Sequence, residues 1–182
     1  MHTMKIIETH IEGLIEVLPD VYSDNRGWFT EVYQQEKFHA LGIKENFIQD
    51  NLSFSKQGVI RGLHFQLDPF AQAKMVRVFS GRVLDVVVDV RKNSKTFGHT
   101  YSCELNAEKQ NILFIPAGFA HGFAALTDAM FYYKCSNVYN KTAEAGIIWN
   151  DKDLQIDWKI EKPIISDKDT QLPSFKEILA RL

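Results

Sequence analysis

The chain has 182 residues, of which 45% are hydrophobic, so it can bury one full core but is short for two domains. We therefore expect a single domain over residues 1–182. The 21 Lys and Arg against 23 Asp and Glu leave a formal net charge of −2 without a basic run, which argues against nucleic-acid binding. Neither a secretory leader nor an apolar run of about 18 residues is found. A cytoplasmic protein without a membrane partner is predicted.

Short segments rich in β-branched and aromatic residues recur along the chain, with turn signals between them. The predicted strands are residues 13–18, 27–33, 47–53, 74–80, 83–90, 100–105, 112–115, 121–126 and 130–136. Many short strands without helical periods between them predict an all-β antiparallel sandwich or barrel. Short peripheral helices are predicted at residues 34–41, before Gly42, and from the capping-box segment at Ser174 through Leu182.

Two features are predicted for the middle of the chain. Gly81 and Arg82, between the segments 74–80 and 83–90, suit a two-residue hairpin turn. Within residues 83–90, the aliphatic side chains at alternate positions share one face, and Asp85 and Asp89 share the other. This pattern predicts one core face and one polar face, which meets solvent, a cavity or a partner. For Asp85, Asp89 and Arg91 we expect structural roles, on a solvated face or in an internal salt bridge.

Two histidines stand out because polar residues accompany them. His64 lies between Arg61 and Gln66, with Lys74 nearby, and His121 follows Pro116 and Gly118. A histidine taken alone is more often a core or hydrogen-bonding residue. Polar groups at alternate positions of one strand, however, indicate a wet cavity.

The two histidines lie at positions where barrels of the cupin type hold a metal ion. Such sites need three or four converging ligands: two histidines spaced HxH, a glutamate, and a histidine from a PxGxxH segment. Here Gln66 stands in place of the second histidine, and Phe70 and Ala71 stand near the glutamate position. We therefore predict that no metal is bound.

The two cysteines, Cys103 and Cys135, lie inside predicted strands and have no CxxC partner. Reduced thiols are expected, in keeping with a cytoplasmic protein.

A long ordered series of segments covers roughly residues 5 to 172, namely residues 24–31, 49–51, 61–66, 72–74, 89–91, 116–123, 133–134, 149–151 and 166–169. In this order and spacing, these segments resemble the dTDP-4-dehydrorhamnose 3,5-epimerase family. The resemblance implies a cupin-like jelly-roll β-sandwich that assembles as a homodimer. It also implies a nucleotide-diphospho-sugar substrate and no metal or organic cofactor.

The same resemblance implies roles for individual residues. His64 would be the general base, Asp169 its carboxylate partner and Tyr133 the acid on the opposite face of the sugar. Lys74 and His121 would line the pocket near the reacting carbonyl. The remaining substrate-binding candidates are Arg26, Glu31, Gln49, Asn51, Arg61 and Tyr139. The chain departs from the family at residues 137–139, where Asn-Val-Tyr stands in place of a frequent pair of adjacent tyrosines.

These residue types suit the chemistry that the resemblance implies. Inverting a carbon next to a ketone requires removal of its proton to give an enolate and return of a proton to the other face. An imidazole, with an ordinary pKa of about 6.5, suits the base, and a neutral phenol suits the acid. A fixed ammonium such as Lys74 stabilises the enolate oxygen, typically by about 3–4 kcal/mol. Arginine forks, here Arg26 and Arg61, match the oxygens of a diphosphate.

Tyr133 is preferred to Tyr132 as the acid because adjacent residues of a strand face opposite ways and Tyr133 precedes Lys134 as in the family motif.

The predicted function is epimerisation of a nucleotide-linked 4-keto-6-deoxy sugar at C3 and C5, of the dTDP-4-dehydro-6-deoxyglucose to dTDP-4-dehydrorhamnose type. The alternatives are an epimerase acting only at C3 or only at C5, a non-catalytic sugar-nucleotide-binding cupin, and a metal-dependent cupin oxygenase. The combination of His64, Asp169 and Tyr133 weighs against a binding protein, and Gln66 weighs against the oxygenase. The nucleotide, the number of inverted carbons and the pathway product stay open.

Overall fold

The computed structural model describes residues 4–182, which form two antiparallel β-sheets and a separate hairpin. The strands are β1 (Lys5–Glu8), β2 (Ile15–Leu18), β3 (Val21–Asp24), β4 (Gly27–Thr30), β5 (Gln49–Ser55), β6 (Ile60–Gln66), β7 (Lys74–Ser80), β8 (Arg82–Asp89), β9 (Thr100–Asn106), β10 (Ile112–Ile115), β11 (Phe119–Ala125), β12 (Ala129–Cys135) and β13 (Glu144–Gly146). The short helices are α1 (Gln35–Ala40), α2 (Asp167–Thr170) and α3 (Phe175–Ile178).

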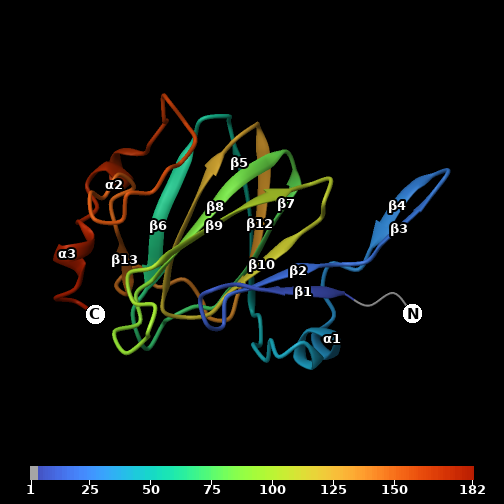
Figure 1. The fold of residues 1–182 in the computed structure, drawn as a ribbon, viewed down its shortest axis with the longest axis horizontal. Helices are drawn as coiled ribbons and strands as arrows, with labels where there is room; N and C mark the ends of the chain where they lie inside the picture. The colour runs from blue at the N-terminus through green and yellow to red at the C-terminus, as the bar shows by residue number, and fades with distance from the viewer. Residues whose placement is uncertain (1–3) are drawn as a thin grey trace.

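The six-stranded sheet has the order β1-β2-β10-β7-β12-β5, and the five-stranded sheet has the order β13-β6-β11-β8-β9. Strands distant in the chain therefore lie side by side, as in a jelly roll. The β3-β4 hairpin extends away from the sandwich, as Figure 1 shows. The predicted all-β, cupin-like fold with short peripheral helices is confirmed. None of the helices within residues 4–182 is long and apolar enough to cross a membrane.

Three hydrophobic clusters hold these elements together. The first joins the inner faces of the two sheets and includes Val76, Leu113, Phe123 and Phe131. A second lies between the five-stranded sheet and the C-terminal segments, and a third lies beneath α1. Fully burying each large aliphatic or aromatic side chain contributes about 1.5–3 kcal/mol. The first cluster fills only part of the space between the sheets, and a polar cavity takes up another part.

The strand predictions differ from the structure mainly in what they omit. β1, β3, β6 and β13 were not among the predicted segments, and β4 is shorter than the predicted 27–33. Three of the omitted strands are only three or four residues long, and the fourth, β6, has seven residues.

Helix ends follow local capping. The side chain of Gln34 accepts the Lys37 N–H at the start of α1, and Gly42, with φ of +89°, follows its end. The capping box of Ser174 and Glu177 is present, but α3 ends at Ile178, well before the predicted Leu182.

The predicted hairpin at Gly81 is wrong. β7 pairs with β10 and β12, whereas β8 pairs with β9 and β11, so the chain passes from one sheet to the other at Gly81. Gly81 has φ of +75°, and a Cβ there would collide with the Asp128 carbonyl oxygen. Gly81 thus forms the corner at which the chain passes from one sheet to the other.

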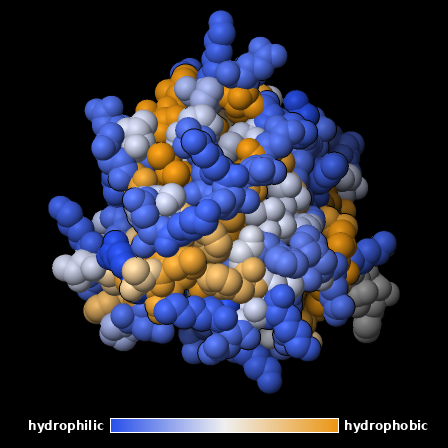
Figure 2. Space-filling model, turned by 60° about the vertical axis from the view of Figure 1, so that its left-hand side comes forward, coloured by the Kyte–Doolittle hydropathy of each residue, from blue (hydrophilic) through white to orange (hydrophobic). Residues whose placement is uncertain are grey.

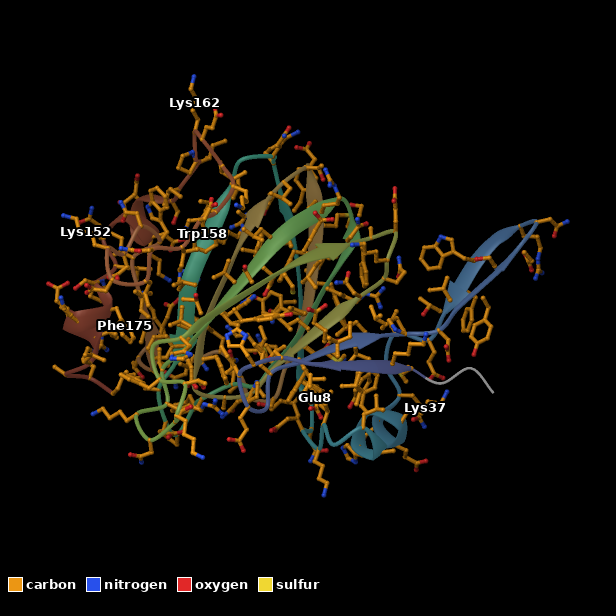
Figure 3. All side chains as sticks on the ribbon, viewed as in Figure 1. Glu8, Lys37, Lys152, Trp158, Lys162 and Phe175 are labelled. Atoms are coloured by element: carbon orange, nitrogen blue, oxygen red, sulfur yellow. The ribbon has the colours of Figure 1, made fainter. Side chains whose placement is uncertain are left out.

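The predicted division of β8 into one core face and one polar face also needs correction. Asp85 and Asp89 are fully buried and share the inner face with Val83 and Val87 of the first cluster. The other face of β8 is buried as well, because C-terminal segments cover it. Trp158 and Phe175 lie among these segments in Figure 3. With both faces covered, the alternating pattern could not show which face meets solvent.

The expected structural roles of Asp89 and Arg91 are confirmed. The Asp89 carboxylate accepts hydrogen bonds from the Arg91 guanidinium and from the hydroxyls of Ser94 and Thr96. Burial alone would raise the pKa of Asp89, but these bonds outweigh it and lower the pKa to about 2.

Candidate active site

A cavity of about 550 Å³ opens between the two sheets. Its volume falls in the usual range for small-molecule sites, which is about 300–1,000 Å³. All of the predicted site residues except Arg26 and Glu31 line it, namely Gln49, Asn51, Arg61, His64, Lys74, His121, Tyr133, Tyr139 and Asp169.

His64 and Asp169 form a hydrogen-bonded pair at the wall of this cavity. The His64 Nε2 and the Asp169 Oδ1 are 2.7 Å apart, although the two residues are separated by 105 positions. The Asp169 Oδ2 also accepts the Gly62 N–H at 3.2 Å. Ser166 caps α2 and thereby helps to place Asp169.

The electrostatics of the pair indicate the form of the imidazole. Burial would raise the pKa of Asp169, but the hydrogen bond and charge of His64 and the Gly62 N–H hold this pKa below its ordinary value. An ionised carboxylate only accepts hydrogen bonds, so the His64 Nε2 must carry the proton. The neutral ring therefore keeps its lone pair on Nδ1, where it can accept a proton.

Tyr133 and Tyr132 face opposite sides of β12, as period two requires. Tyr133 lines the cavity from the six-stranded sheet, whereas His64 lines it from the five-stranded sheet. Burial raises the pKa of Tyr133, which keeps its phenol protonated at neutral pH. The Tyr132 hydroxyl instead donates to Asp50 at 3.0 Å, and its ring stacks on Phe79.

Lys74 lines the cavity at the start of β7, next to Cys135 on the neighbouring strand β12. Burial lowers the pKa of Lys74, while the negative charges of Asp85 and Glu144 act in the opposite direction. Cys103 and Cys135 are both free thiols. Burial raises the pKa of Cys135, so it is a poor nucleophile despite its position.

His121 has a carboxylate partner that the sequence reasoning assigned elsewhere. The His121 Nε2 lies 2.9 Å from Asp85 Oδ2, and both residues are buried. Asp85 was expected to be structural, whereas the structure places it directly behind a cavity residue. The clue in the sequence was a charged residue inside an otherwise aliphatic strand.

The polar side chains at the mouth of the cavity are held by one another. The Arg61 Nε donates to Ser55 Oγ at 2.9 Å, which leaves part of its guanidinium free toward the cavity. Glu144 accepts a hydrogen bond from the Tyr139 hydroxyl at 3.0 Å and pairs with Lys168 at 2.6 Å. Glu144 and Lys168 also line the cavity but were not among the predicted site residues, although Lys168 lies within the matching segment 166–169.

Gln66 occupies the position of a cupin metal ligand but makes other bonds. Its Nε2 donates to the carbonyls of Phe70 and Val138, and its Oε1 accepts the Asn140 N–H. In residues 4–182, no group of three or more His, Cys, Asp and Glu side chains is arranged to hold a metal ion.

Arg26 and Glu31 do not line the cavity of their own chain, so their role in substrate binding stays a prediction. Arg26 is exposed at the turn of the β3-β4 hairpin and pairs with Asp24. Glu31 pairs with Lys37 at 2.7 Å and lines a separate cavity of about 480 Å³ at the base of the hairpin. Lys37 is labelled there in Figure 3, far from the C-terminal segments.

Comparison with known proteins agrees with this arrangement. The dTDP-4-dehydrorhamnose 3,5-epimerase family model matches residues 8–177. The dTDP-4-dehydrorhamnose 3,5-epimerase of Shigella flexneri is 49% identical over 174 residues, covering 94% of this chain and 96% of that protein.

Two solved structures illustrate the likeness in three dimensions. The dTDP-6-deoxy-D-glucose-3,5-epimerase of Legionella pneumophila, in complex with dTDP-4-keto-L-rhamnose, is 41% identical with a TM-score of 0.94, covering 98% of this chain and 96% of that one. A 3′-monoepimerase from Streptomyces bikiniensis, in complex with dTDP-quinovose, is 34% identical with a TM-score of 0.88, covering all (100%) of this chain and 90% of that one. On this sequence match and this common fold, the chain belongs to the dTDP-4-dehydrorhamnose 3,5-epimerase family.

Proposed function

We propose that the protein epimerises a dTDP-linked 4-keto-6-deoxy sugar at C3 and C5, converting dTDP-4-dehydro-6-deoxyglucose to dTDP-4-dehydrorhamnose. The observation that carries this proposal is the placement of a base and an acid on opposite walls of one cavity. His64, backed by Asp169, belongs to the five-stranded sheet, and Tyr133 belongs to the six-stranded sheet. Inversion at a carbon requires two such groups on opposite sides of the sugar ring.

The reaction begins with removal of a proton from the carbon next to the C4 ketone. Nδ1 of His64 takes this proton, and the electron pair moves to the ketone oxygen to give an enolate. The Asp169 carboxylate offsets the positive charge that forms on the ring. The ammonium of Lys74 stabilises the enolate oxygen.

The second half of the reaction returns a proton to the opposite face. The Tyr133 hydroxyl donates this proton to the carbon, and the enolate collapses to the ketone with inverted configuration. The phenolate must then regain a proton, and the proton held by His64 must leave, before the second carbon reacts. The nucleotide diphosphate and the sugar are held by Arg61, Gln49 and Asn51. The charge of the diphosphate stays the same throughout the reaction.

Arg26 and Glu31 support a further proposal, that the protein acts as a homodimer. The hairpin that carries Arg26 extends away from its own cavity, and Trp28 and Phe29 on it are exposed. Leu52 and Phe54 on the outer face of the six-stranded sheet are also exposed. A second copy that covers these surfaces would bring Arg26 and Glu31 toward its cavity. Sedimentation equilibrium giving only the monomer mass would contradict the dimer.

We also infer a cytoplasmic location and a single functional unit. The free thiols of Cys103 and Cys135 are consistent with a reducing compartment. The cavity takes Gln49 from the first third of the chain and Asp169 from its end, which supports one domain over residues 1–182.

The test of the main proposal is deuterium uptake from heavy water into dTDP-4-dehydro-6-deoxyglucose, followed by proton NMR. We expect deuterium at both C3 and C5 and formation of the doubly inverted product. Absence of exchange at either carbon, with folded protein and intact substrate, would overturn the proposal.

The same experiment decides between double and single inversion. The likeness to the 3′-monoepimerase makes inversion at C3 alone the second candidate. Exchange and inversion confined to C3 would establish that alternative and contradict epimerisation at C5.

A further inference from the structure

The pair formed by His121 and Asp85 lies directly beside the pair formed by His64 and Asp169. His121 and His64 are cross-strand neighbours on β11 and β6, so their side chains approach the cavity side by side. Asp85 lies behind His121 on the next strand, β8, and has no exposed surface. The mechanism described above leaves this second pair without a task.

Asp85 has the contacts of a group that serves the cavity and not those of a structural aspartate. Its Oδ2 bonds His121 at 2.9 Å, and its Oδ1 is buried without a hydrogen-bond partner among the described residues. Asp89, four residues along the same strand, has both oxygens bonded, to Arg91, Ser94 and Thr96. A buried carboxylate costs several kcal/mol unless it is paired, so an incompletely bonded one indicates a role beyond folding.

The charged and titratable groups around Asp85 come from four strands. Burial, the largest effect, raises the pKa of Asp85, and Glu16 on β2 acts in the same direction, while His121 on β11 and Lys74 on β7 oppose this rise. Cys103 on β9 also faces it and has its own pKa raised by burial and by Asp85. Asp85 is therefore the acidic group that His121 and Lys74 share.

We propose that Asp85 is a positioning residue for the epimerisation, acting on both His121 and Lys74. Through the bond to Nε2, it fixes the ring of His121 so that Nδ1 is directed toward the cavity. Its negative charge keeps the ammonium of Lys74 protonated beside that ring. Together His121 and Lys74 then stabilise the enolate oxygen of the bound keto sugar. This inference rests on the proposed function, because it assigns the residues that receive the enolate.

The charge of Asp85 has a predictable effect on the pH profile. Lys74 faces Cys135 on β12, Asp85 on β8 and Glu144 on β13, and each of these groups favours its protonated form against the effect of burial. Lys74 must be protonated to stabilise an enolate, so activity falls as pH rises through its pKa. Removal of the Asp85 charge lowers this pKa, and the alkaline limb of kcat then moves to lower pH.

The test compares Asp85→Asn with Asp89→Asn, two variants of buried aspartates on one face of one strand. For Asp85→Asn we expect kcat to fall about 10- to 100-fold, the effect of losing a hydrogen bond to a charged group. We expect KM to change little and the alkaline limb to move to lower pH. Asp89→Asn should lower thermal stability but leave the alkaline limb of the kcat pH profile at the same pH as in the parent. Equal pH profiles for Asp85→Asn and the parent, or an equal displacement in Asp89→Asn, would overturn the proposal.

A double-mutant cycle isolates the route through His121. If Asp85 acts through this ring, Asp85→Asn combined with His121→Gln should lose less activity than the product of the two single losses. Multiplicative losses would show that Asp85 does not act through His121.

A measurement on the unmodified protein covers the case in which Asp85→Asn does not fold. Long-range ¹H–¹⁵N NMR of the histidine rings, assigned with His121→Gln, reads which nitrogen carries the proton. We expect the Nε2 of His121, the atom that faces Asp85, to carry the proton. A bare Nε2 would contradict the proposal. Because this result does not depend on turnover, it separates failure of the positioning role from failure of the epimerase function, which the heavy-water experiment reads.

Discussion

The two histidine–carboxylate pairs are alike in composition but differ in where their carboxylates come from. Asp169 belongs to a short helix near the C-terminus and reaches a half-exposed His64, with Nε2 and Oδ1 2.7 Å apart. Asp85 belongs to a central strand and holds a buried His121 at 2.9 Å. The first pair can exchange protons with substrate and solvent, whereas the second is better suited to hold a fixed orientation and charge. Solvent access, more than residue type, distinguishes the proposed base His64 from its neighbour His121.

The outer faces of the two sheets also differ in how far they are covered by other parts of the chain. In Figure 2, which brings the C-terminal side forward, hydrophobic areas lie between hydrophilic side chains. There the C-terminal segments already cover the five-stranded sheet. Part of the outer face of the six-stranded sheet, by contrast, leaves Leu52, Phe54 and Phe79 exposed. The second surface is the one that the proposed dimer would cover.

The largest expected effect distinguishes the two histidines. His64→Asn should lower solvent exchange at the sugar by about 10³-fold or more, because it removes the base. His121→Asn should lower it much less, because it removes only part of the enolate stabilisation. Calorimetric titration with dTDP provides the control, since affinity for the nucleotide should survive in both variants. A His64→Asn variant that turned over within about tenfold of the parent would mean that another group is the base.

A smaller effect is expected from the acid on the opposite wall. Tyr133→Phe should lower the yield of epimer about 10²-fold, while His64 still removes protons and recaptures deuterium on the same face. Tyr132→Phe is the matched control, because Tyr132 bonds Asp50 on the other side of the strand. Proton NMR of one substrate sample reads both exchange and inversion. Equal epimer yields from Tyr133→Phe and the parent would remove Tyr133 from the mechanism.

Stability against acid should depend on the structural aspartate Asp89. Asp89→Asn should cost about 1–3 kcal/mol at neutral pH, because it disrupts a buried charged network. The pKa of Asp89 is lowered to about 2 in the folded chain, so its contribution is complete above its ordinary pKa of about 4 and is lost as pH falls toward 2. Denaturant melts of parent and variant should therefore converge at acidic pH. A difference that stays constant from neutral pH downward would contradict this assignment.

Removal of metal ions is expected to have no effect on the reaction. Because the Nε2 atoms of both histidines already face carboxylates and Gln66 bonds backbone groups, exhaustive chelation should leave kcat and KM unchanged. Assays before and after treatment with EDTA, with zinc, manganese and iron(II) added back singly, provide the check. Activity that is lost on chelation and restored by one ion would show that the two imidazoles serve a metal.

Features that depend on local pattern and on chemical type could be predicted from the amino-acid sequence. Period-two alternation located most strands, and β7 and β10 match their predicted ends. Period two also separated Tyr133 from Tyr132, whose side chains face opposite sides of β12. The ordered resemblance to the family predicted His64, Lys74 and Asp169 as neighbours, and these residues line one cavity.

Which strands and helices contact one another became known only from the three-dimensional structure. Alternation along β8 could not show that Asp85 faces the interior, because both faces of this strand are covered. A local turn signal at Gly81 could not distinguish a hairpin from a corner between sheets, since both need a positive φ. The sequence likewise did not indicate that Arg26 lies far from the cavity of its own chain. Strand partners and burial depend on contacts between residues distant in the chain, which no local pattern encodes.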